Sequence, residues 1–346
     1  MITITDFGQH HGQKVYKYTL QNKNDTRLGV LNFAGILQEF SVATPSGERV
    51  NLVLSSDKLE NLLADYNINR VIGRTAGRIR NGQWVQNGQQ ITTPSNENGH
   101  TLHGGAQGLG EQFFEVTINE SNNSVTLYRK QTSDDDGFPG TLDVSVTYQL
   151  TADDRVIITF TGTQFDTDGV FNPTVHTYFN LANKEEQTVL EHDLWLNSTQ
   201  HLAVNHDKVP TGGLIDNADS LFDLKNHSDL GQALHSLQET TSEGGFDDVF
   251  LVRPDLTAPI GYLEDRHSGR RITIYSDRNA AVIFTAGQLD SQVVKNLNRG
   301  DGHPSLAVAI EAQTAPNSEN LRALGDTFLP AGEKRTHTII YAYTQK

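Results

Sequence analysis

The chain has 346 residues, a formal charge of −15 at pH 7 and no cysteine, and 36% of its residues are hydrophobic while 20% are charged. This composition is typical of a soluble globular protein with a sizeable core. The negative charge disfavours nucleic acid and anionic membrane surfaces as partners because their phosphates would be repelled. The lack of cysteine excludes disulfides, thiolate metal sites and cysteine nucleophiles.

The N-terminal segment does not look like an export signal. Residues 1–6 read Met-Ile-Thr-Ile-Thr-Asp and have neither a basic start nor a long apolar run. No apolar stretch approaches the roughly 18 residues that a membrane-spanning helix needs. We therefore expect a soluble cytoplasmic protein.

Alternating apolar and polar residues predict strands along much of the chain. The clearest run is Leu142–Leu150, in which every second residue is apolar, as in a strand with one buried face. Similar runs occur at Phe113–Asn119, Val125–Arg129, Arg155–Thr161, Arg271–Tyr275 and Thr336–Tyr343. Turn-forming residues such as Pro45-Ser46-Gly47 and Asn122-Asn123 separate the runs.

Helical periodicity is weak, and only Leu59–Tyr66 and Leu230–Leu237 predict short helices. We interpret the acidic run Asp134–Asp136 as a solvated loop. Strands without regular helices between them favour an antiparallel sandwich or barrel over an α/β fold. Because no linker, repeat or shift in composition divides the chain, we expect one all-β domain over residues 1–346.

Two glycine-punctuated segments in the first third carry candidate binding residues. In residues 72–79, Arg74 and Arg78 could donate hydrogen bonds to ligand hydroxyls or a carboxylate, although a structural ion pair is an equal alternative for each. In residues 98–105, His103 precedes two glycines that would let the backbone approach a ligand. The His100 and His103 spacing suits a metal, but no third ligand follows at a matching interval, so we do not predict a metal site.

Three segments in the second half carry candidate acid and base groups. His176 lies in Asn172-Pro173-Thr174-Val175-His176-Thr177-Tyr178-Phe179-Asn180-Leu181, where amides and aromatic rings suit a polar ligand with an apolar face, such as a sugar. Asp247 follows Gly244-Gly245-Phe246 and could accept hydrogen bonds from vicinal hydroxyls, or form a turn. Glu311 follows five apolar residues, so burial is expected to raise its pKa toward that of a general base. Phosphate-binding loops and a Gly-x-Ser-x-Gly nucleophile motif do not occur.

The types of these segments and their order along the chain resemble those of the aldose 1-epimerase family, the galactose mutarotases. The matching pieces are Gly73-Arg74 through Arg78-Ile79, Asn98 through Leu102-His103-Gly104-Gly105, His176 through Leu181, Gly245-Phe246-Asp247, Glu311-Ala312-Gln313 and the ending Phe328–Lys334. The resemblance covers nearly the whole chain.

The resemblance implies a large antiparallel β-sandwich that interconverts the α and β anomers of a free aldose without a cofactor. It implies that Glu311 is the base that removes the C1 hydroxyl proton and that His176 is the acid that protonates the ring oxygen. It also implies that Arg78, His103 and Asp247 bind the sugar, with Tyr178 as a further candidate. A small sugar would be the partner, and a homodimer is compatible with the sequence.

This chain departs from the family pattern at two positions near the expected site. The family usually has asparagine where this chain has Gly77, so one ligand-binding amide is missing and the sugar preference could differ. A histidine commonly follows the site aspartate, but Asp248 stands here, and the Gly-Phe-Asp register favours Asp247 over Asp248 as the sugar ligand.

Four alternatives to a monosaccharide mutarotase are open from the sequence. The first is an epimerase for the reducing end of a disaccharide such as maltose. A sugar phosphate would require more basic residues than Arg74, Arg78 and Arg80. A non-catalytic carbohydrate-binding domain would not need both His176 and Glu311, and a metal-dependent β-sandwich enzyme would contain a stoichiometric metal.

Overall fold

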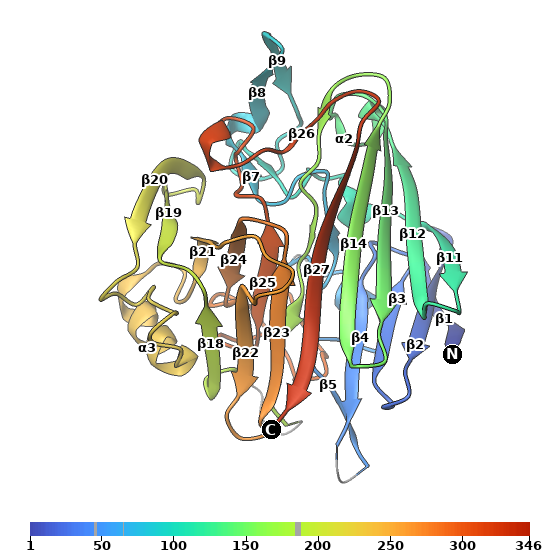
Figure 1. Ribbon diagram of the computed structural model, residues 1–346, viewed down its shortest axis with the longest axis vertical. Coiled ribbons are helices and arrows are strands. Elements are labelled where there is room, and N and C mark those ends of the chain that lie inside the picture. Colours follow the sequence, from blue (N-terminus) through green and yellow to red (C-terminus); the bar gives the residue numbers. More distant parts are fainter. Residues whose placement is uncertain (45–46, 65, 184–187) are drawn as a thin grey trace.

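The computed structural model describes residues 1–44, 47–64, 66–183 and 188–346. Most of its regular structure consists of strands, which pair antiparallel in three larger sheets and several two-stranded ones (Figure 1). The prediction of an all-β fold with few short helices is confirmed. Pro45, Ser46 and Asp65, which belong to the predicted turn at 45–47 and the predicted helix at 59–66, lie outside the described residues.

The largest sheet has eight strands and contains all six runs predicted from alternation. In spatial order the strands are β11 (Glu115–Asn119), β12 (Ser124–Gln131), β13 (Leu142–Leu150), β14 (Arg155–Gln164), β27 (Lys334–Gln345), β23 (Arg270–Ser276), β22 (Gly261–Asp265) and β18 (His192–Leu196). The apolar residues of β13 are buried and its polar residues are partly exposed, as the alternation predicts. The last strand, β27, lies between β14 and β23 (Figure 1).

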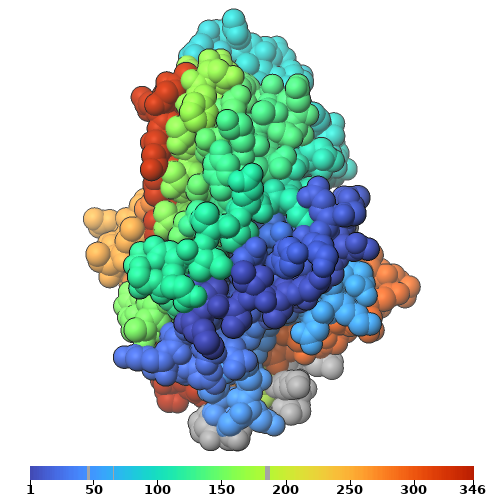
Figure 2. All heavy atoms as spheres, turned by 90° about the vertical axis from the view of Figure 1, so that its right-hand side faces the viewer, coloured from blue at the N-terminus to red at the C-terminus, as the bar shows by residue number. Residues whose placement is uncertain are grey.

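Two further sheets pack against the inner face of the eight-stranded sheet. One consists of β1 (Ile2–His10), β2 (Gln13–Gln21), β3 (Arg27–Leu31), β4 (Leu37–Ala43) and β5 (Arg49–Asn51). Its strands, blue in Figure 2, form much of the surface that faces the viewer in that figure. The shared core joins Ile158 of β14 to Phe40 of β4, and Tyr148 donates a hydrogen bond to the carbonyl of Gly35 over 2.9 Å. The fold is therefore a β-sandwich.

The third sheet has six strands and provides the floor of the site described below. Its order is β17 (Tyr178–Phe179), β25 (Val308–Gln313), β24 (Ala280–Phe284), β21 (Asp247–Leu251), β19 (Gln200–Val204) and β20 (Pro210–Asp216). Every residue of β25 is buried, because one of its faces lies on the sandwich core and the other is covered by loops.

Short strand pairs and helical turns connect the sheets. The pairs are β6 (Val71–Ile72) with β16 (Thr174–Val175), β7 (Arg78–Ile79) with β10 (Thr101–Leu102), β8 (Gln83–Gln86) with β9 (Gln89–Thr92), and β15 (Gly169–Val170) with β26 (Phe328–Leu329). The α-helices are α1 (Leu59–Leu62), α2 (Ser133–Asp136) and α3 (Leu230–Thr240). The 3₁₀ turns span Arg80–Gly82, Leu109–Glu111 and Arg322–Leu324. In the described part of the chain, no helix combines the length and apolarity needed to cross a membrane.

Both predicted helices exist, but their lengths differ from the prediction. The first is a single turn, and Asn67 beyond it has φ 51, a left-handed conformation that an α-helix does not contain. The second, α3, continues to Thr240, three residues beyond the predicted end at Leu237. These three residues are polar and exposed, so the apolar pattern from which the helix was predicted does not extend to them. Its N-terminus is capped by Asp229, whose side chain accepts a hydrogen bond from the backbone of Gln232.

The interpretation of Asp134–Asp136 as a solvated loop is wrong. The segment forms helix α2, in which the side chain of Asp135 accepts a hydrogen bond from the backbone N–H of Thr132 as part of a capping box. Asp136 is buried and binds the buried guanidinium of Arg74, with Nε to Oδ2 at 2.7 Å. Two of the three acidic residues, Asp135 and Asp136, therefore have structural partners.

Candidate active site

Three neighbouring strands of the six-stranded sheet place polar and aromatic side chains in one pocket of about 610 Å³. Because alternate residues of a strand share a face, Glu311 and Gln313 of β25 lie on the same side. Glu311 pairs across with Val282 of β24, which pairs with Val249 of β21. In the adjacent row Phe284 pairs with Asp247. The loops and short strands that cover this face of the sheet contribute further lining residues: Arg78, Glu97, His103, His176, Lys208 and Pro316.

Glu311 and His176 meet although they are far apart in the sequence. His176 follows β16, and the next strand, β17, pairs with β25 through Tyr178 and Ala309, which brings the histidine beside the glutamate. His176 Nε2 lies 3.4 Å from Glu311 Oε1, and both side chains are buried. Within the described part of the chain, His176 Nδ1 and Glu311 Oε2 have no hydrogen-bond partner. Buried polar atoms without a partner are rare and are typical of functional sites.

A buried hydrogen-bond network joins the two segments that carry this pair. The hydroxyl of Thr174 donates to the carbonyl of Ala312 over 2.9 Å, and the amide of Asn172 donates to the carbonyl of Thr314 over 3.0 Å. The guanidinium of Arg278 donates to the hydroxyl of Thr314 over 2.9 Å and also to the side chain of Asn172. These bonds fix the spacing between β25, which carries Glu311, and the segment that leads into His176.

Burial shifts the pKa values of the two residues in opposite directions. It raises the pKa of Glu311 to about 8, and the nearby Asp247 adds to the shift while Arg78 opposes it. It lowers the pKa of His176 to about 4, because a charged imidazole is also disfavoured away from water. Near neutral pH, Glu311 and His176 together therefore hold one proton, on the carboxyl group of Glu311.

Arg78 and Asp247 place a cation and a carboxylate beside this pair. Arg78 donates two hydrogen bonds to Glu97, from Nε over 2.5 Å and from Nη2 over 2.9 Å. Burial alone would lower the pKa of Arg78, but Glu97, Asp247 and Glu311 outweigh it and raise that pKa. Burial raises the pKa of Asp247, while Arg78 and Lys208 lower it. A bidentate arginine held in this way can donate to hydroxyl groups in a fixed direction.

His103 completes the polar wall. Its Nδ1 accepts a hydrogen bond from the backbone N–H of Gly77 over 3.2 Å, so Nε2 is the nitrogen free to act in the pocket. Burial lowers the pKa of His103 well below the usual value, and His176 and Arg78 add to this shift. In the described part of the chain, His103, His176 and Glu311 have ligand atoms within 4.8 Å of one another, which is the grouping that could hold a metal ion.

A family model described as aldose 1-epimerase matches residues 16–342. The chain belongs to the aldose 1-epimerase family. It is 35% identical to a maltose epimerase from Levilactobacillus brevis, over 100% of this chain and 99% of that one. It is 32% identical to an aldose 1-epimerase from Streptococcus thermophilus, over 99% and 98%. The crystal structure of an aldose epimerase homologue from C. elegans superimposes with a TM-score of 0.85 at 26% identity, covering 94% of this chain and 98% of the other.

Two of the sequence candidates of this aldose 1-epimerase family member lie outside the pocket. Arg74 is fully buried against Asp136 and donates to the carbonyls of Pro139 and Gly140, so it is a structural residue. His100 accepts a hydrogen bond from the backbone of Asn81 and lies 3.4 Å from Asp207. His100 and His103 therefore do not form the pair that the metal spacing suggested.

Of the two glycines after His103, only Gly104 acts differently from the expectation. A Cβ at Gly104 would lie 1.9 Å from the carbonyl oxygen of Gly73, so this glycine permits close packing of two backbone segments rather than the approach of a ligand. Gly105 does line the pocket. The loop is thus held against the arginine-bearing segment, and this contact positions His103.

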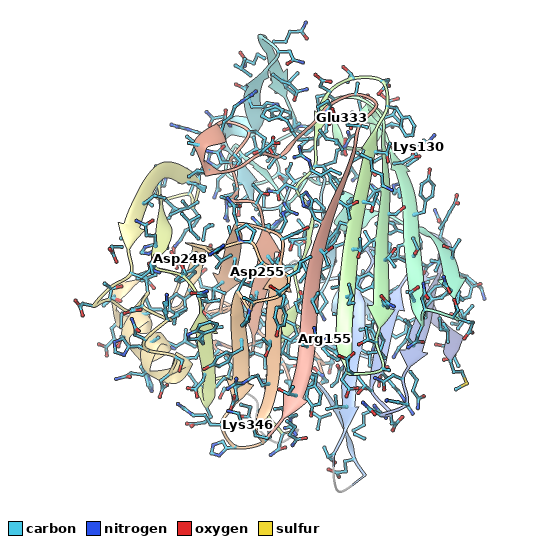
Figure 3. All side chains as sticks on the ribbon, in the orientation of Figure 1. Lys130, Arg155, Asp248, Asp255, Glu333 and Lys346 are labelled. Carbon is cyan, nitrogen blue, oxygen red and sulfur yellow. The ribbon has the colours of Figure 1, made fainter. Side chains whose placement is uncertain are left out.

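The structure separates the two neighbouring aspartates. Asp247 lines the pocket, whereas Asp248 pairs across with Ile283 and does not belong to the lining. Figure 3 labels Asp248 beside β21. Its carboxylate accepts a hydrogen bond from the backbone of Asp247 over 3.1 Å. Strand alternation directs the two side chains to opposite faces, in keeping with the Gly-Phe-Asp register.

Tyr178 forms part of the pocket wall. Its hydroxyl donates to the carbonyl of Tyr66 over 2.9 Å, and its ring centroid lies 4.8 Å from that of His176. The ring therefore packs against the acid candidate and limits its movement.

Sequence reasoning missed several residues of the site. The pocket is also lined by Glu97, Lys208, Phe284 and Gln313. The first three lie outside the segments that we selected for their chemistry, and Gln313 was noted only as part of the Glu311 motif. A single signal was available for Gln313, because it lies two residues after Glu311 and so on the same face of a strand.

Proposed function

We propose that this aldose 1-epimerase family member interconverts the α and β anomers of free aldohexoses by acid/base ring opening and closure. The observation that carries the proposal is the 3.4 Å separation of Glu311 Oε1 and His176 Nε2 at the floor of a pocket. O1 and O5 of the sugar are bonded to the same carbon, so an adjacent base and acid can address both oxygens at once.

In the forward reaction, the carboxylate of Glu311 takes the proton of the C1 hydroxyl and the imidazolium of His176 protonates the ring oxygen. The C1–O5 bond breaks, and C1 becomes the aldehyde carbon. After rotation about C1–C2, O5 attacks the other face of the aldehyde, and the two protons return. Each well-placed acid or base of this kind typically contributes 10²–10⁴-fold in rate.

The proton count of the buried pair agrees with this cycle. Ring opening converts a carboxylate and an imidazolium into a carboxylic acid and a neutral imidazole, and the total number of protons on the two residues stays at one. The neutral form is the one that burial favours, since it raises the pKa of Glu311 to about 8 and lowers that of His176 to about 4. The pocket therefore stabilises the protonation state that accompanies the open sugar.

In this proposal Arg78, His103 and Asp247 bind the sugar hydroxyls, and Tyr178 supports the ring of His176. The cation, the neutral imidazole and the carboxylate offer donors and acceptors around the rim of a single sugar ring. Their position beside the acid/base pair supports this assignment.

The test is polarimetry of freshly dissolved α-D-galactose with wild type, Glu311→Gln and His176→Asn. The expected result is fast decay to the equilibrium rotation for wild type and a slowing of 10²-fold or more in each variant. Glu319→Gln and His192→Asn are matched controls, because both residues are buried and lie outside the pocket lining, and they should keep the wild-type rate. A wild type that matches buffer alone on galactose, glucose and maltose would overturn the enzymatic proposal in favour of a sugar-binding protein.

A reducing disaccharide is a second candidate substrate class. A pocket of about 610 Å³ is in the middle of the usual range of roughly 300–1,000 Å³ for drug-sized ligands, and the relative from Levilactobacillus brevis is a maltose epimerase. The comparison to make is kcat/KM for maltose, galactose and glucose. A value for maltose at least tenfold above both monosaccharides would favour the disaccharide.

We further propose that the enzyme needs no cofactor, acts in the cytoplasm and can form a homodimer. Proton transfer between two side chains and the sugar requires no redox or nucleotide group, which supports the first point. Activity that is lost on chelation and restored by a divalent cation would contradict it and would point to His103, His176 and Glu311 as ligands. Sedimentation analysis tests the dimer, and fractionation of cells tests the compartment.

A further inference from the structure

Gln313 has a buried amide with unused hydrogen-bonding capacity at the edge of the pocket. The side chain is 0% exposed and lines the pocket. Neither Nε2 nor Oε1 has a hydrogen-bond partner among the described residues. A primary amide offers two donor hydrogens and an acceptor oxygen, so both kinds of capacity are unmet.

The position of Gln313 relative to the acid/base pair follows from strand register. Along β25, Ala309, Glu311 and Gln313 face the same side, and they pair across with Phe284, Val282 and Ala280. Tyr178 pairs with Ala309 at one end of this row. Gln313 therefore lies beyond Glu311 on the side away from Tyr178.

Gly77 lies close to this amide and brings no side chain to it. It has φ +73, and a Cβ built there would lie 3.3 Å from Gln313 Nε2 and 2.4 Å from Cβ of Pro316. Where the family usually has an asparagine, this chain thus has no second amide beside Gln313, and Pro316 lies where a side chain of residue 77 would begin.

We propose that Gln313 binds a sugar hydroxyl that flanks the reacting O1–C1–O5 unit, either the one on C2 beside C1 or the one on C6 across the ring oxygen, and contributes to substrate specificity. A hydroxyl group both donates and accepts, so it can satisfy the amide oxygen or nitrogen that the protein leaves without a partner. A site built to bind a hydroxyl discriminates strongly against an analogue that lacks it, since the protein group is then left buried and unpaired. This inference rests on the proposed function, because it places the sugar at Glu311 and His176.

The first experiment measures KM and kcat for Gln313→Met, which keeps the length of the side chain but removes its hydrogen bonds. We expect kcat/KM for galactose to fall about ten- to a hundredfold, mainly through KM. The thermal midpoint should stay at or above that of wild type, because the amide has no partner to lose. Gln38→Met is the matched control: Gln38 is buried outside this pocket, and its Nε2 donates to the carbonyl of Ser56, so this variant should lose stability and keep KM.

The second experiment identifies the hydroxyl with galactose, 2-deoxygalactose and 6-deoxygalactose. If Gln313 binds one of these hydroxyls, the sugar that lacks it should bind wild type and Gln313→Met equally, while the other two should still distinguish them. Equal losses for all three sugars, or values of Gln313→Met within twofold of wild type throughout, would overturn the proposal and leave pocket water as the partner of the amide.

Calorimetric binding of galactose to Glu311→Gln and to the double variant Glu311→Gln/Gln313→Met separates this inference from the proposed function. Weaker binding by the double variant supports Gln313 as a sugar ligand even if wild type does not accelerate mutarotation, an outcome that would overturn only the proposed function. Equal binding by both would overturn the role of Gln313 alone. A wild type that neither binds nor converts any of the sugars would overturn both.

Discussion

The carboxyl group of Glu311 and the imidazole of His176 lie 3.4 Å apart, and burial holds the pKa of Glu311 above that of His176, at about 8 and about 4. Between these values the pair holds one proton, which is the number that ring opening requires. Below this range both groups are protonated and no base remains, and above it both are deprotonated and no acid remains.

The first prediction is therefore a flat-topped pH profile. We expect kcat/KM for galactose to be nearly constant between about pH 4 and pH 8 and to fall on both sides, since kcat/KM reports the pKa values of the free enzyme. The two limbs belong to the coupled pair rather than to single residues. A profile that rises continuously through pH 8 would contradict the requirement for a proton on the pair.

The second prediction concerns stability at alkaline pH. The folded-state pKa of Glu311 is raised above its ordinary value of 4.5, so the stability that the neutral carboxyl provides is present below pH 4.5 and is lost as pH rises through about 8. Glu311→Gln removes this loss and should be more stable than wild type at pH 9, by an upper limit of about 5 kcal/mol. Urea unfolding at pH 5 and pH 9 measures the difference. An equal stability of the two proteins at pH 9 would contradict the buried position of the carboxyl.

The third prediction separates the two arginines of the glycine-rich segment. Arg74→Ala leaves Asp136 buried without its partner and should destabilise the fold by about 3–5 kcal/mol while KM stays near the wild-type value. Arg78→Met should instead raise KM, with a small effect on stability because Arg78 and Glu97 are partly exposed. The double variant Arg74→Met/Asp136→Leu serves as control and should recover much of the stability. Equal KM effects of Arg74→Ala and Arg78→Met would contradict the assignment.

The fourth prediction concerns Arg278, which donates to Thr314 and Asn172 beneath the acid/base pair. Burial lowers the pKa of Arg278 to about 9, so its positive charge is retained at neutral pH. Lysine cannot reproduce the forked donors of arginine, so Arg278→Lys should lower kcat about tenfold or more while leaving KM within about twofold. Steady-state kinetics after a check of the folded fraction by circular dichroism would test this. A change in KM alone would indicate that the network shapes sugar binding rather than the spacing of His176 and Glu311.

Local patterns predicted the strands well and their neighbours poorly. The alternation in Leu142–Leu150 identifies a strand because it depends only on which face is buried, and the structure has the same bounds. The position of β27 between β14 and β23 depends on pairings between segments far apart in the chain. The alternation of apolar and polar residues within one strand does not show which strands are its neighbours. The single-domain prediction stays a prediction.

The candidate site shows the same division. Burial of Glu311 could be predicted from the apolar run before it, and its approach to His176 could not, because it follows from the pairing of β17 with β25. Asp136 was misread since nothing in the letters Asp134-Asp135-Asp136 distinguishes the one carboxylate that reaches Arg74. Lys208 comes from a hairpin loop that carries no periodic pattern.

The location of β27 has a consequence for synthesis of the protein. Because this strand holds β14 and β23 together, residues 334–345 must be synthesised before the two halves of the eight-stranded sheet can join. Until then a nascent chain exposes the edges of β14 and β23, and unpaired edges are sites of aggregation. The sandwich thus closes only when β27 is added, and a chain that stops before residue 334 would carry both Glu311 and His176 without a closed sandwich to hold them.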